Sequence, residues 1–341
     1  MEHKLTISPS PHVFTGRSTR GIMGDVLIAL APALVVSAWV FGAQVLAVTV
    51  LSVACCVVFE WLIQKFLIKG PATVGNLSAV VTGVLLAFNL PSSIPLWLVI
   101  LGAFIAVGVG KMTFGGLGKN PFNPALVGRV FLLIAYPVQM TSFPTATAAG
   151  AGMLDAATGA TPLSLAKGIL KGGGSVADVM TQMGISDLGL AIGQHSGSLG
   201  EVAAIALILG GLYLLARRVI TWHIPVAVLG TMAVFSAILW GANPESYMSP
   251  LFHLLTGGAL LGAFFMATDY STSPMTRKGG IIFGVGIGLI TIIIRLWGAY
   301  PEGMSFAILI MNAVVPLIDK YVKPQRFGVA NRASSAASAK K

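Results

Sequence analysis

The residues best suited to carry chemistry lie in a small polar stretch, Leu-Asp-Ala-Ala-Thr-Gly-Ala-Thr-Pro, at 154–162. The residues TPLSLAKGIL at 161–170 predict a short helix with Thr161 as its N-cap and Pro162 as its first residue. A helix N-terminus offers free amide donors, so a phosphate esterified to the Thr161 hydroxyl would sit where an anion is favoured. On geometry alone, an unmodified capped helix outside the membrane is the simpler interpretation.

The neighbours of Thr161 fit a modification site. Gly159 and Ala160 add little side-chain bulk, which would let a modifying enzyme approach the backbone. Asp155 and Thr158 can form hydrogen bonds with the turn or with an incoming group. We therefore take these four residues and Thr161 as one candidate site.

A second set of candidates consists of ionisable side chains in or near long apolar runs. Asp25, Glu60 and Asp269 are the acidic residues nearest the predicted spans, and charged groups inside a membrane are costly and usually functional. We take these three carboxylates as candidates for an ion path. Capping or snorkelling at a span end is the alternative interpretation for Asp25 and Asp269.

No metal site is expected. His223 and His253 lack metal-ligand spacing and are interpreted as ordinary hydrogen-bonded histidines. Cys55 and Cys56 are adjacent inside an apolar run, and two cysteines are too few for an iron–sulfur cluster.

The composition requires a membrane to position these residues. The chain has 341 residues, of which 55% are hydrophobic and only 9% charged, whereas soluble domains carry about 25% charged residues. The apolar runs are long and continuous, which favours α-helices over a β-barrel. The net charge of +10 does not indicate nucleic-acid binding, because no basic stripe alternates with aromatic residues.

We predict an all-α integral membrane protein with about ten transmembrane helices. The third and fifth predicted spans are short and suggest broken or half-length helices. The predicted spans are 22–41, 43–64, 77–90, 95–112, 124–140, 199–216, 220–241, 251–268, 279–298 and 303–319.

The basic residues predict the orientation. With the N-terminus inside, 18 of the 21 Lys and Arg residues fall on the inner side, and Lys167, Lys171 and Arg295 fall on the outer side. Both termini are then cytoplasmic, and the long loop at 141–198 lies outside.

The five spans before and the five after this loop suggest two inverted five-helix repeats. Gly83, Ser92 and Pro95 match Gly262, Ser271 and Pro274 at one constant offset of 179. Short interrupted helices at corresponding positions usually mark a central ligand site. The predicted divisions are a cytoplasmic segment 1–21, a first repeat 22–140, an outer loop 141–198, a second repeat 199–319 and a cytoplasmic basic tail 320–341.

The residues DAATGAT at 155–161 resemble the flavinylation motif Asp-x-x-(Ser/Thr)-Gly-Ala-Thr, on which a flavin transferase joins FMN to the last threonine through a phosphoester. Asp155, Thr158, Gly159, Ala160 and Thr161 fill every fixed position. The rest of the chain also resembles the NqrB/RnfD family of membrane redox subunits, through SPSPH near the N-terminus, FNPALVGR at 122–129 and FMATDYSTSP at 265–274.

This resemblance implies a subunit of an ion-translocating ferredoxin:NAD oxidoreductase (Rnf) complex. Covalent FMN on Thr161 would relay electrons coupled to Na+ or H+ movement, and a second, non-covalent riboflavin is implied in the membrane part. The implied partners are Rnf subunits A, B, C, E and G, a flavin transferase and membrane lipid. No catalytic side chain is expected in this chain alone.

The family's fold resembles the inverted repeats of urea and ammonium transporters. A bacterial or archaeal cytoplasmic membrane is the implied location. Two alternatives stay open, namely a B subunit of the sodium-pumping NADH:quinone reductase and a non-redox channel or transporter. The short segment before LTISPSPH favours the Rnf branch over the quinone reductase, and a channel would leave the flavinylation motif unexplained.

Overall fold

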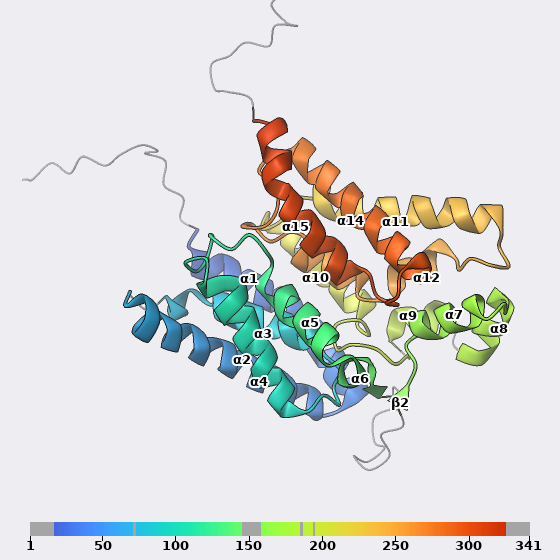
Figure 1. Ribbon diagram of the computed structural model, residues 1–341, viewed down its shortest axis with the longest axis horizontal. Coiled ribbons are helices and arrows are strands. Elements are labelled where there is room, and N and C mark those ends of the chain that lie inside the picture. The colour runs from blue at the N-terminus through green and yellow to red at the C-terminus, as the bar shows by residue number, and fades with distance from the viewer. Residues whose placement is uncertain (1–16, 71–72, 145–157, 185–186, 194, 325–341) are drawn as a thin grey trace, which may run out of the picture.

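The computed structural model describes residues 17–324 except 71–72, 145–157, 185–186 and 194. Helices dominate the described chain, and two short strands form a single pair (Figure 1). Five helices are long and apolar enough to cross a membrane: α1 (Thr19–Phe41), α2 (Gln44–Leu62) with its π-helical extension η1 (Ile63–Ile68), α11 (His223–Ala242), α14 (Arg277–Trp297) and α15 (Met304–Tyr321). The chain is therefore a multi-pass membrane protein.

Shorter apolar helices occupy the other predicted spans. They are α3 (Ser78–Phe88), α4 (Leu96–Phe104) with the π-helical extension η3 (Ile105–Met112), α5 (Pro124–Ala135) and α10 (Ala204–Ala216). The expectation of short third and fifth helices is confirmed. At α5 the helix ends at Ala135, because Tyr136 precedes Pro137 and the residue before a proline disfavours helical geometry.

The predicted continuous span at 251–268 was wrong. It consists of α12 (Pro250–Leu255), α13 (Ala259–Leu261) and the π-helical η4 (Gly262–Met266). Gly257 and Gly258 adopt φ of 68° and 63°, a left-handed conformation that favours glycine and interrupts the helix. The predicted span at 199–216 also begins later than expected, because helix α10 starts only at Ala204.

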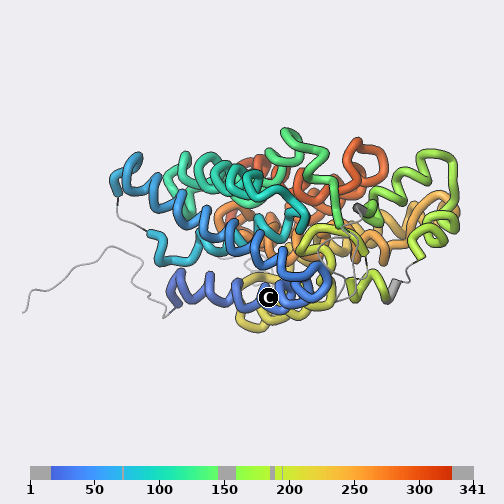
Figure 2. The backbone as a smooth tube through the Cα atoms, turned by 90° about the horizontal axis from the view of Figure 1, so that it is seen from below, coloured from blue at the N-terminus to red at the C-terminus, as the bar shows by residue number. Residues whose placement is uncertain are grey.

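Helices pack together both within each half of the sequence and between the halves. Helix α1 lies along α10, and the two are adjacent in Figure 2. Helices α2 and α3 pack closely, and so do α11 and α14. Gly83 permits the first of these contacts, because a Cβ there would lie 2.6 Å from the Val53 Cα atom.

The segment between the two groups of apolar helices folds into a small layer with its own core, called the outer layer below. It comprises α6 (Pro137–Thr141), β1 (Phe143–Pro144), β2 (Thr158–Gly159), α7 (Pro162–Lys171), α8 (Val176–Met183) and α9 (Asp187–Ile192). Its buried core includes Leu163, Val179 and Phe252, the last from α12. Ser175 and Asp178 form a capping box at α8, and the hydrogen bonds from Ser175 lower the pKa of the Asp178 carboxyl.

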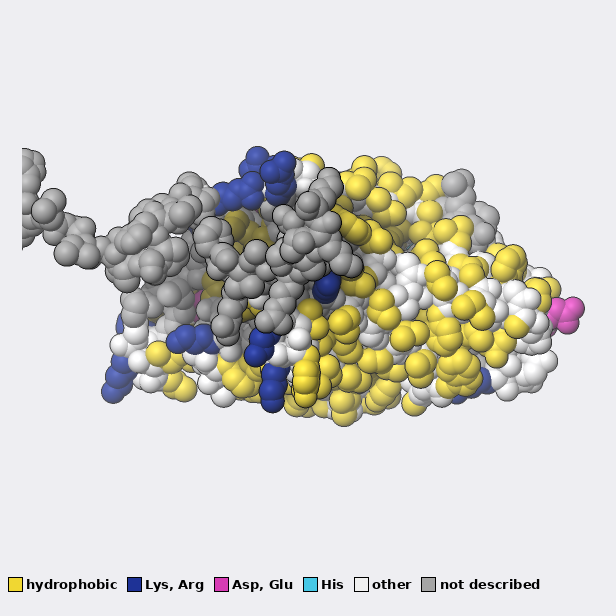
Figure 3. Space-filling view, turned by 90° about the horizontal axis from the view of Figure 1, so that it is seen from above, with side chains coloured by type: hydrophobic (Ala, Val, Ile, Leu, Met, Phe, Trp, Pro, Cys, Tyr) yellow, Lys and Arg dark blue, Asp and Glu magenta, His cyan; other side chains and the backbone are white. Residues whose placement is uncertain are grey.

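Charged side chains are unevenly distributed on the surface. On the face in Figure 3, most visible Lys and Arg side chains lie toward one end, and a broad hydrophobic area covers much of the rest. The exposed apolar side chains of the molecule include Trp39, Leu67 and Val138. Large exposed apolar side chains are stable in contact with lipid, which agrees with the membrane assignment.

Candidate functional site

Two interrupted helices meet in the middle of the molecule. Asn89, directly after α3, donates from Nδ2 to the Met266 Sδ atom at 3.7 Å, and Met266 ends η4. Asn123 donates to the Met266 carbonyl at 3.2 Å and also caps α5. These bonds satisfy polar groups at the helix ends, as irregular backbone within a membrane protein requires.

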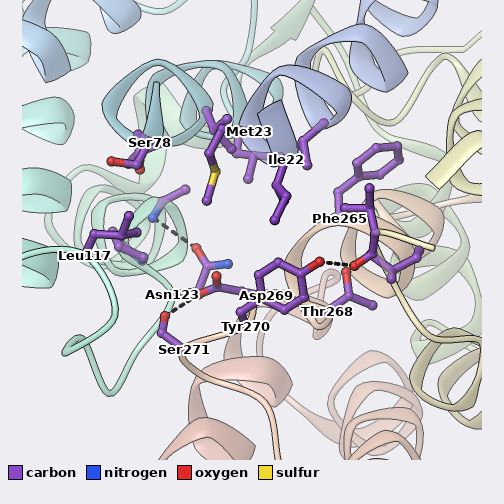
Figure 4. Close-up of a pocket in the computed structure, with 18 of the residues that line it drawn as sticks. Ile22, Met23, Ser78, Leu117, Asn123, Phe265, Thr268, Asp269, Tyr270 and Ser271 are labelled. Atoms are coloured by element: carbon purple, nitrogen blue, oxygen red, sulfur yellow. Dashed lines mark hydrogen bonds between the residues drawn. The ribbon is translucent and has the colours of Figure 1, made fainter. Parts of the chain in front are cut away.

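A cavity lies next to this junction. It has about 750 Å³ of empty space, part of it open to solvent. Figure 4 shows Asn123, Asp269 and Ser271 on one side of it and Ile22 and Met23 of α1 on the other. Elements of both halves of the chain line the cavity. The cavity therefore lies in the place where the interrupted helices led us to expect a ligand site.

The Glu60 carboxylate forms a buried ion pair at the edge of this cavity. Lys111 Nζ lies 2.6 Å from Glu60 Oε2 and 2.6 Å from the Ser78 hydroxyl oxygen. Gln64 Nε2 lies 3.4 Å from Glu60 Oε1. Both π-helical segments contribute, because Gln64 belongs to η1 and Lys111 to η3. The charge pattern of the sequence places Lys111 among the inner-side basic residues, but its side chain is buried.

Asp269 is in a different environment. Its carboxylate accepts hydrogen bonds from the hydroxyl groups of Ser271 at 3.0 Å and Thr272 at 3.2 Å. Within the described residues, no Lys or Arg nitrogen lies within 4.0 Å of it. Asp269 lines the cavity, so an incoming cation can reach its carboxylate.

Asp25 lies at the end of the α1–α10 pair. It accepts a hydrogen bond from the Tyr213 hydroxyl at 3.0 Å and lies 3.4 Å from a guanidinium nitrogen of the exposed Arg217. These contacts agree with the alternative interpretation of Asp25 as an interfacial residue. Of the three candidate carboxylates, only Asp269 lines the cavity. Glu60 lies behind the lining residues Lys111 and Ser78, and Asp25 is also outside the lining.

A second buried charge cluster involves Arg129 and Arg295, which the sequence places in or at the ends of spans, and Glu302, which sequence reasoning missed. Arg129 of α5 forms an ion pair with Glu302 and lies 2.6 Å from Asn89 Oδ1. Arg295 of α14 donates to the carbonyls of His253 at 2.5 Å and Thr256 at 2.8 Å, which are freed where α12 ends. Glu302 lies just before a predicted span, so its position along the chain did not indicate burial.

The helix predicted at 161–170 is confirmed. Helix α7 begins at Pro162, and the Thr161 Oγ1 atom accepts a hydrogen bond from the Ser164 amide at 3.2 Å. Thr161 Oγ1 also lies 3.0 Å from Ser164 Oγ. Thr161 is only 2% exposed, and the first turns of α7 pack into the core of the outer layer through Leu163 and Ala166.

The other residues of the candidate modification site lie just before α7. Gly159 pairs with Phe143 and Thr158 pairs with Pro144 in the short β1–β2 ladder. Ala160 is exposed at the turn into α7. Asp155 lies outside the described residues. The ladder and the N-cap hold the threonine at a fixed point of the outer layer.

The fold and the central cavity define a multi-pass membrane protein with buried charges where its interrupted helices meet. A family model described as the NQR2, RnfD, RnfE family matches residues 6–328. The chain belongs to this family.

Several curated relatives match nearly the whole chain. The D subunit of a Na(+)-translocating ferredoxin:NAD(+) oxidoreductase complex from Acetobacterium woodii is 47% identical over 330 residues, covering 96% of each chain. The D subunit of a proton-translocating ferredoxin:NAD(+) oxidoreductase complex from Clostridium ljungdahlii is 43% identical, covering 95% of this chain and 96% of the relative. The D subunit of an ion-translocating oxidoreductase complex from Ectopseudomonas mendocina is 38% identical over 332 residues, covering 94% of each chain.

Proposed function

We propose that this chain is the D subunit of an ion-translocating ferredoxin:NAD oxidoreductase complex and carries FMN on Thr161. The observation that carries the proposal is a complete flavinylation motif ending at the N-cap of α7, in a chain whose relatives bear that name. The other complex subunits would supply the electron donor and acceptor. The flavin supplies the redox chemistry, and this chain holds it in place.

The geometry of α7 fits a phosphoester. The first turn of a helix has free amide donors, and Pro162 at the first position removes none that the helix would use. A phosphate on Thr161 Oγ1 would lie beside these donors and the positive end of the helix dipole. Because Thr161 is buried, we expect the flavin transferase to act before the turn at 158–161 packs, or to loosen it.

The central cavity is where we place the second, non-covalent riboflavin. It lies between the two halves where interrupted helices meet, which is the usual place of a ligand site in such membrane proteins. Asn120 and Asn123 offer amide groups, and Phe264 and Phe265 offer apolar ring surface. Residues at this cavity would bind and orient the ring rather than react with it.

We also propose the finer architecture predicted from the sequence, with about ten spans in inverted five-helix repeats and both termini cytoplasmic. The gathering of basic side chains toward one end supports this orientation. The proposed location is a bacterial or archaeal cytoplasmic membrane, with Rnf subunits A, B, C, E and G as partners.

The first prediction tests the attachment site. In a host that supplies the flavin transferase, the Thr161→Val chain should lose all covalent FMN, because valine keeps the shape but lacks the ester oxygen. The chain should still insert, since losing one N-cap costs only about 0.5–2 kcal/mol. The measurement is flavin fluorescence in a denaturing gel, followed by peptide mass analysis.

Two matched variants sharpen this experiment. Thr161→Ser keeps a hydroxyl and should retain partial flavinylation, and Thr158→Ala should have a milder effect than Thr161→Val. Equal fluorescence of wild type and Thr161→Val would show that the attachment site is wrong. A wild-type chain without flavin, despite active transferase, would remove the main support for the redox function.

A further inference from the structure

A second cavity lies in the outer layer, beside the helix that Thr161 caps. It is formed by α7, the residues just before α12, α12 itself and the end of α14, and has about 770 Å³ of empty space, part of it open to solvent. Leu163, Ala166, Lys167 and Leu170 of α7 line it. At about 1.5 Å per residue, this lining extends roughly 10 Å along the helix.

Every ionised side chain that lines this outer cavity is a cation. These are Lys167, Lys171 and Arg295, and no Asp or Glu is among the lining residues that the structure describes. Lys167 Nζ lies 2.7 Å from the Tyr300 carbonyl, and Lys171 Nζ lies 3.4 Å from the Gly298 carbonyl. Burial, and secondly the neighbouring Lys171 ammonium, lower the pKa of Lys167 to about 8. An anionic ligand would relieve the repulsion between the Lys167 and Lys171 ammonium groups.

Two buried polar atoms on the lining residues have no hydrogen-bond partner in the described structure. Arg295 is 3% exposed, and its Nε atom is unpaired although both terminal nitrogens donate to carbonyls. The Nδ1 atom of His253, which is 4% exposed, is also unpaired, contrary to the expectation of an ordinary hydrogen-bonded histidine. Buried polar groups are normally hydrogen-bonded, so each of these two atoms leaves a hydrogen bond for a bound group to complete.

The rest of the lining is apolar and aromatic. Tyr247, Phe252 and Trp297 contribute rings, and Trp297 is 56% exposed at the rim. A ligand that suits this lining has a flat apolar body and carries acceptor groups with negative charge. An isoalloxazine ring offers a flat apolar body with carbonyl and ring nitrogen acceptors along one edge, and it gains negative charge on reduction.

We propose that the outer cavity holds the isoalloxazine ring of the flavin attached to Thr161, with Lys167, Lys171 and Arg295 facing its polar edge. This inference rests on the proposed function. The lining begins at Leu163, two residues after Thr161, so the phosphate and ribityl chain would run from the N-terminus of α7 to the ring. Cations beside the ring stabilise its reduced, more negative form and therefore raise its reduction potential.

The second prediction tests this docking on the full chain, co-expressed with the flavin transferase. In the double variant Lys167→Gln/Lys171→Gln, covalent flavin should remain, but acrylamide should quench its fluorescence more strongly than in wild type. At a fixed solution potential, the ratio of oxidised to reduced flavin should rise at least about tenfold. This corresponds to a reduction potential that is lower by about 30 mV for two electrons. Thr161→Val supplies the signal of any non-covalent flavin for subtraction.

Lys278→Gln is the matched control, because it removes an exposed cation at the opposite end of α14. It should leave quenching and potential unchanged, and size-exclusion chromatography should show that all variants are folded. Attached flavin with unchanged quenching and potential in the double variant would overturn the docking but not the flavinylation. If the double variant loses bound phospholipid while quenching and potential stay unchanged, the outer cavity is a lipid site and the docking of the flavin is overturned. Absence of covalent flavin from wild type would overturn the proposed function itself.

Discussion

At the scale of single residues, the three candidate carboxylates differ in how their charge is balanced. Glu60 is paired with Lys111 at 2.6 Å, and Asp25 lies near Arg217 at 3.4 Å. Asp269 accepts hydrogen bonds from Ser271 and Thr272, and no Lys or Arg nitrogen of the described structure lies within 4.0 Å of it. A carboxylate without an ion-pair partner in direct contact is the one best able to receive a mobile cation, so Asp269 becomes the strongest of the three candidates.

The third prediction follows from this ranking. In the assembled complex, Asp269→Ala should lower ion-coupled transport severalfold while leaving the covalent flavin content unchanged. Asp25→Ala should have little effect on transport, because Asp25 acts as an interfacial partner of Tyr213 and Arg217. The measurement is ion uptake by proteoliposomes per electron transferred. Normal coupling in Asp269→Ala would place the ion path elsewhere, including in partner subunits.

Glu60 serves as the comparison, because its partner Lys111 lines the same cavity as Asp269. Removing its charge leaves the Lys111 ammonium buried and unpaired, which typically costs about 3–5 kcal/mol. Loss of activity in a Glu60→Ala chain therefore has to be separated from loss of folding, whereas Asp269 has no such partner among the described residues.

At the scale of the elements, close contacts between helices depend on two glycines at equivalent sequence positions. A Cβ atom at Gly83 of α3 would lie 2.6 Å from the Val53 Cα atom of α2. A Cβ atom at Gly262 of η4 would lie 2.5 Å from the Met304 Cγ atom. Backbone cannot move away without separating two helices, but a methionine side chain can adopt another rotamer.

The fourth prediction uses this difference. Gly83→Ala should destabilise the protein by about 1–3 kcal/mol or more, because the added methyl group meets backbone. Gly262→Ala should destabilise the protein less, because the Met304 side chain can adopt another rotamer. Thermal unfolding of the purified chains in one detergent compares them, with the exposed Gly241 changed to Ala as a control that meets no atom within 4 Å. Equal destabilisation by both changes would contradict the packing argument.

At the scale of the whole molecule, the orientation in the membrane decides on which side the flavin proposed at Thr161 would lie. The uneven distribution of Lys and Arg favours a position of the outer layer, with α7 and α8, outside the cytoplasm. A flavin relay at Thr161 would then exchange electrons on that side.

The fifth prediction tests this orientation. A cysteine introduced at Ser175, the N-cap of α8, should react with a membrane-impermeant thiol reagent in intact cells. A cysteine at Ser335 in the basic tail should react only after lysis. Chains in which Cys55 and Cys56 are replaced by Ser provide the background. Labelling at Ser335 but not at Ser175 in intact cells would reverse the proposed topology.

Some of the candidate site was predictable because the relevant interactions are local. The N-cap at Thr161, the start of α7 at Pro162 and the short α3 all depend on residues within a few positions of one another. Local steric and capping rules are sufficient for such features. The break within 251–268 was missed because two adjacent glycines also occur inside helices, as they do at Gly279 and Gly280 of α14.

The sequence by itself determined the class of protein, the family and the modification motif, because hydropathy, charge and short motifs are properties of neighbouring residues. Only the tertiary structure decided which charges are buried and with which partners. Lys111 meets Glu60 across 51 positions, and Arg129 meets Glu302 across 173. Partners so distant in sequence are selected by how the helices pack, and the outer cavity beside α7 likewise exists only where α12 and α14 end next to it.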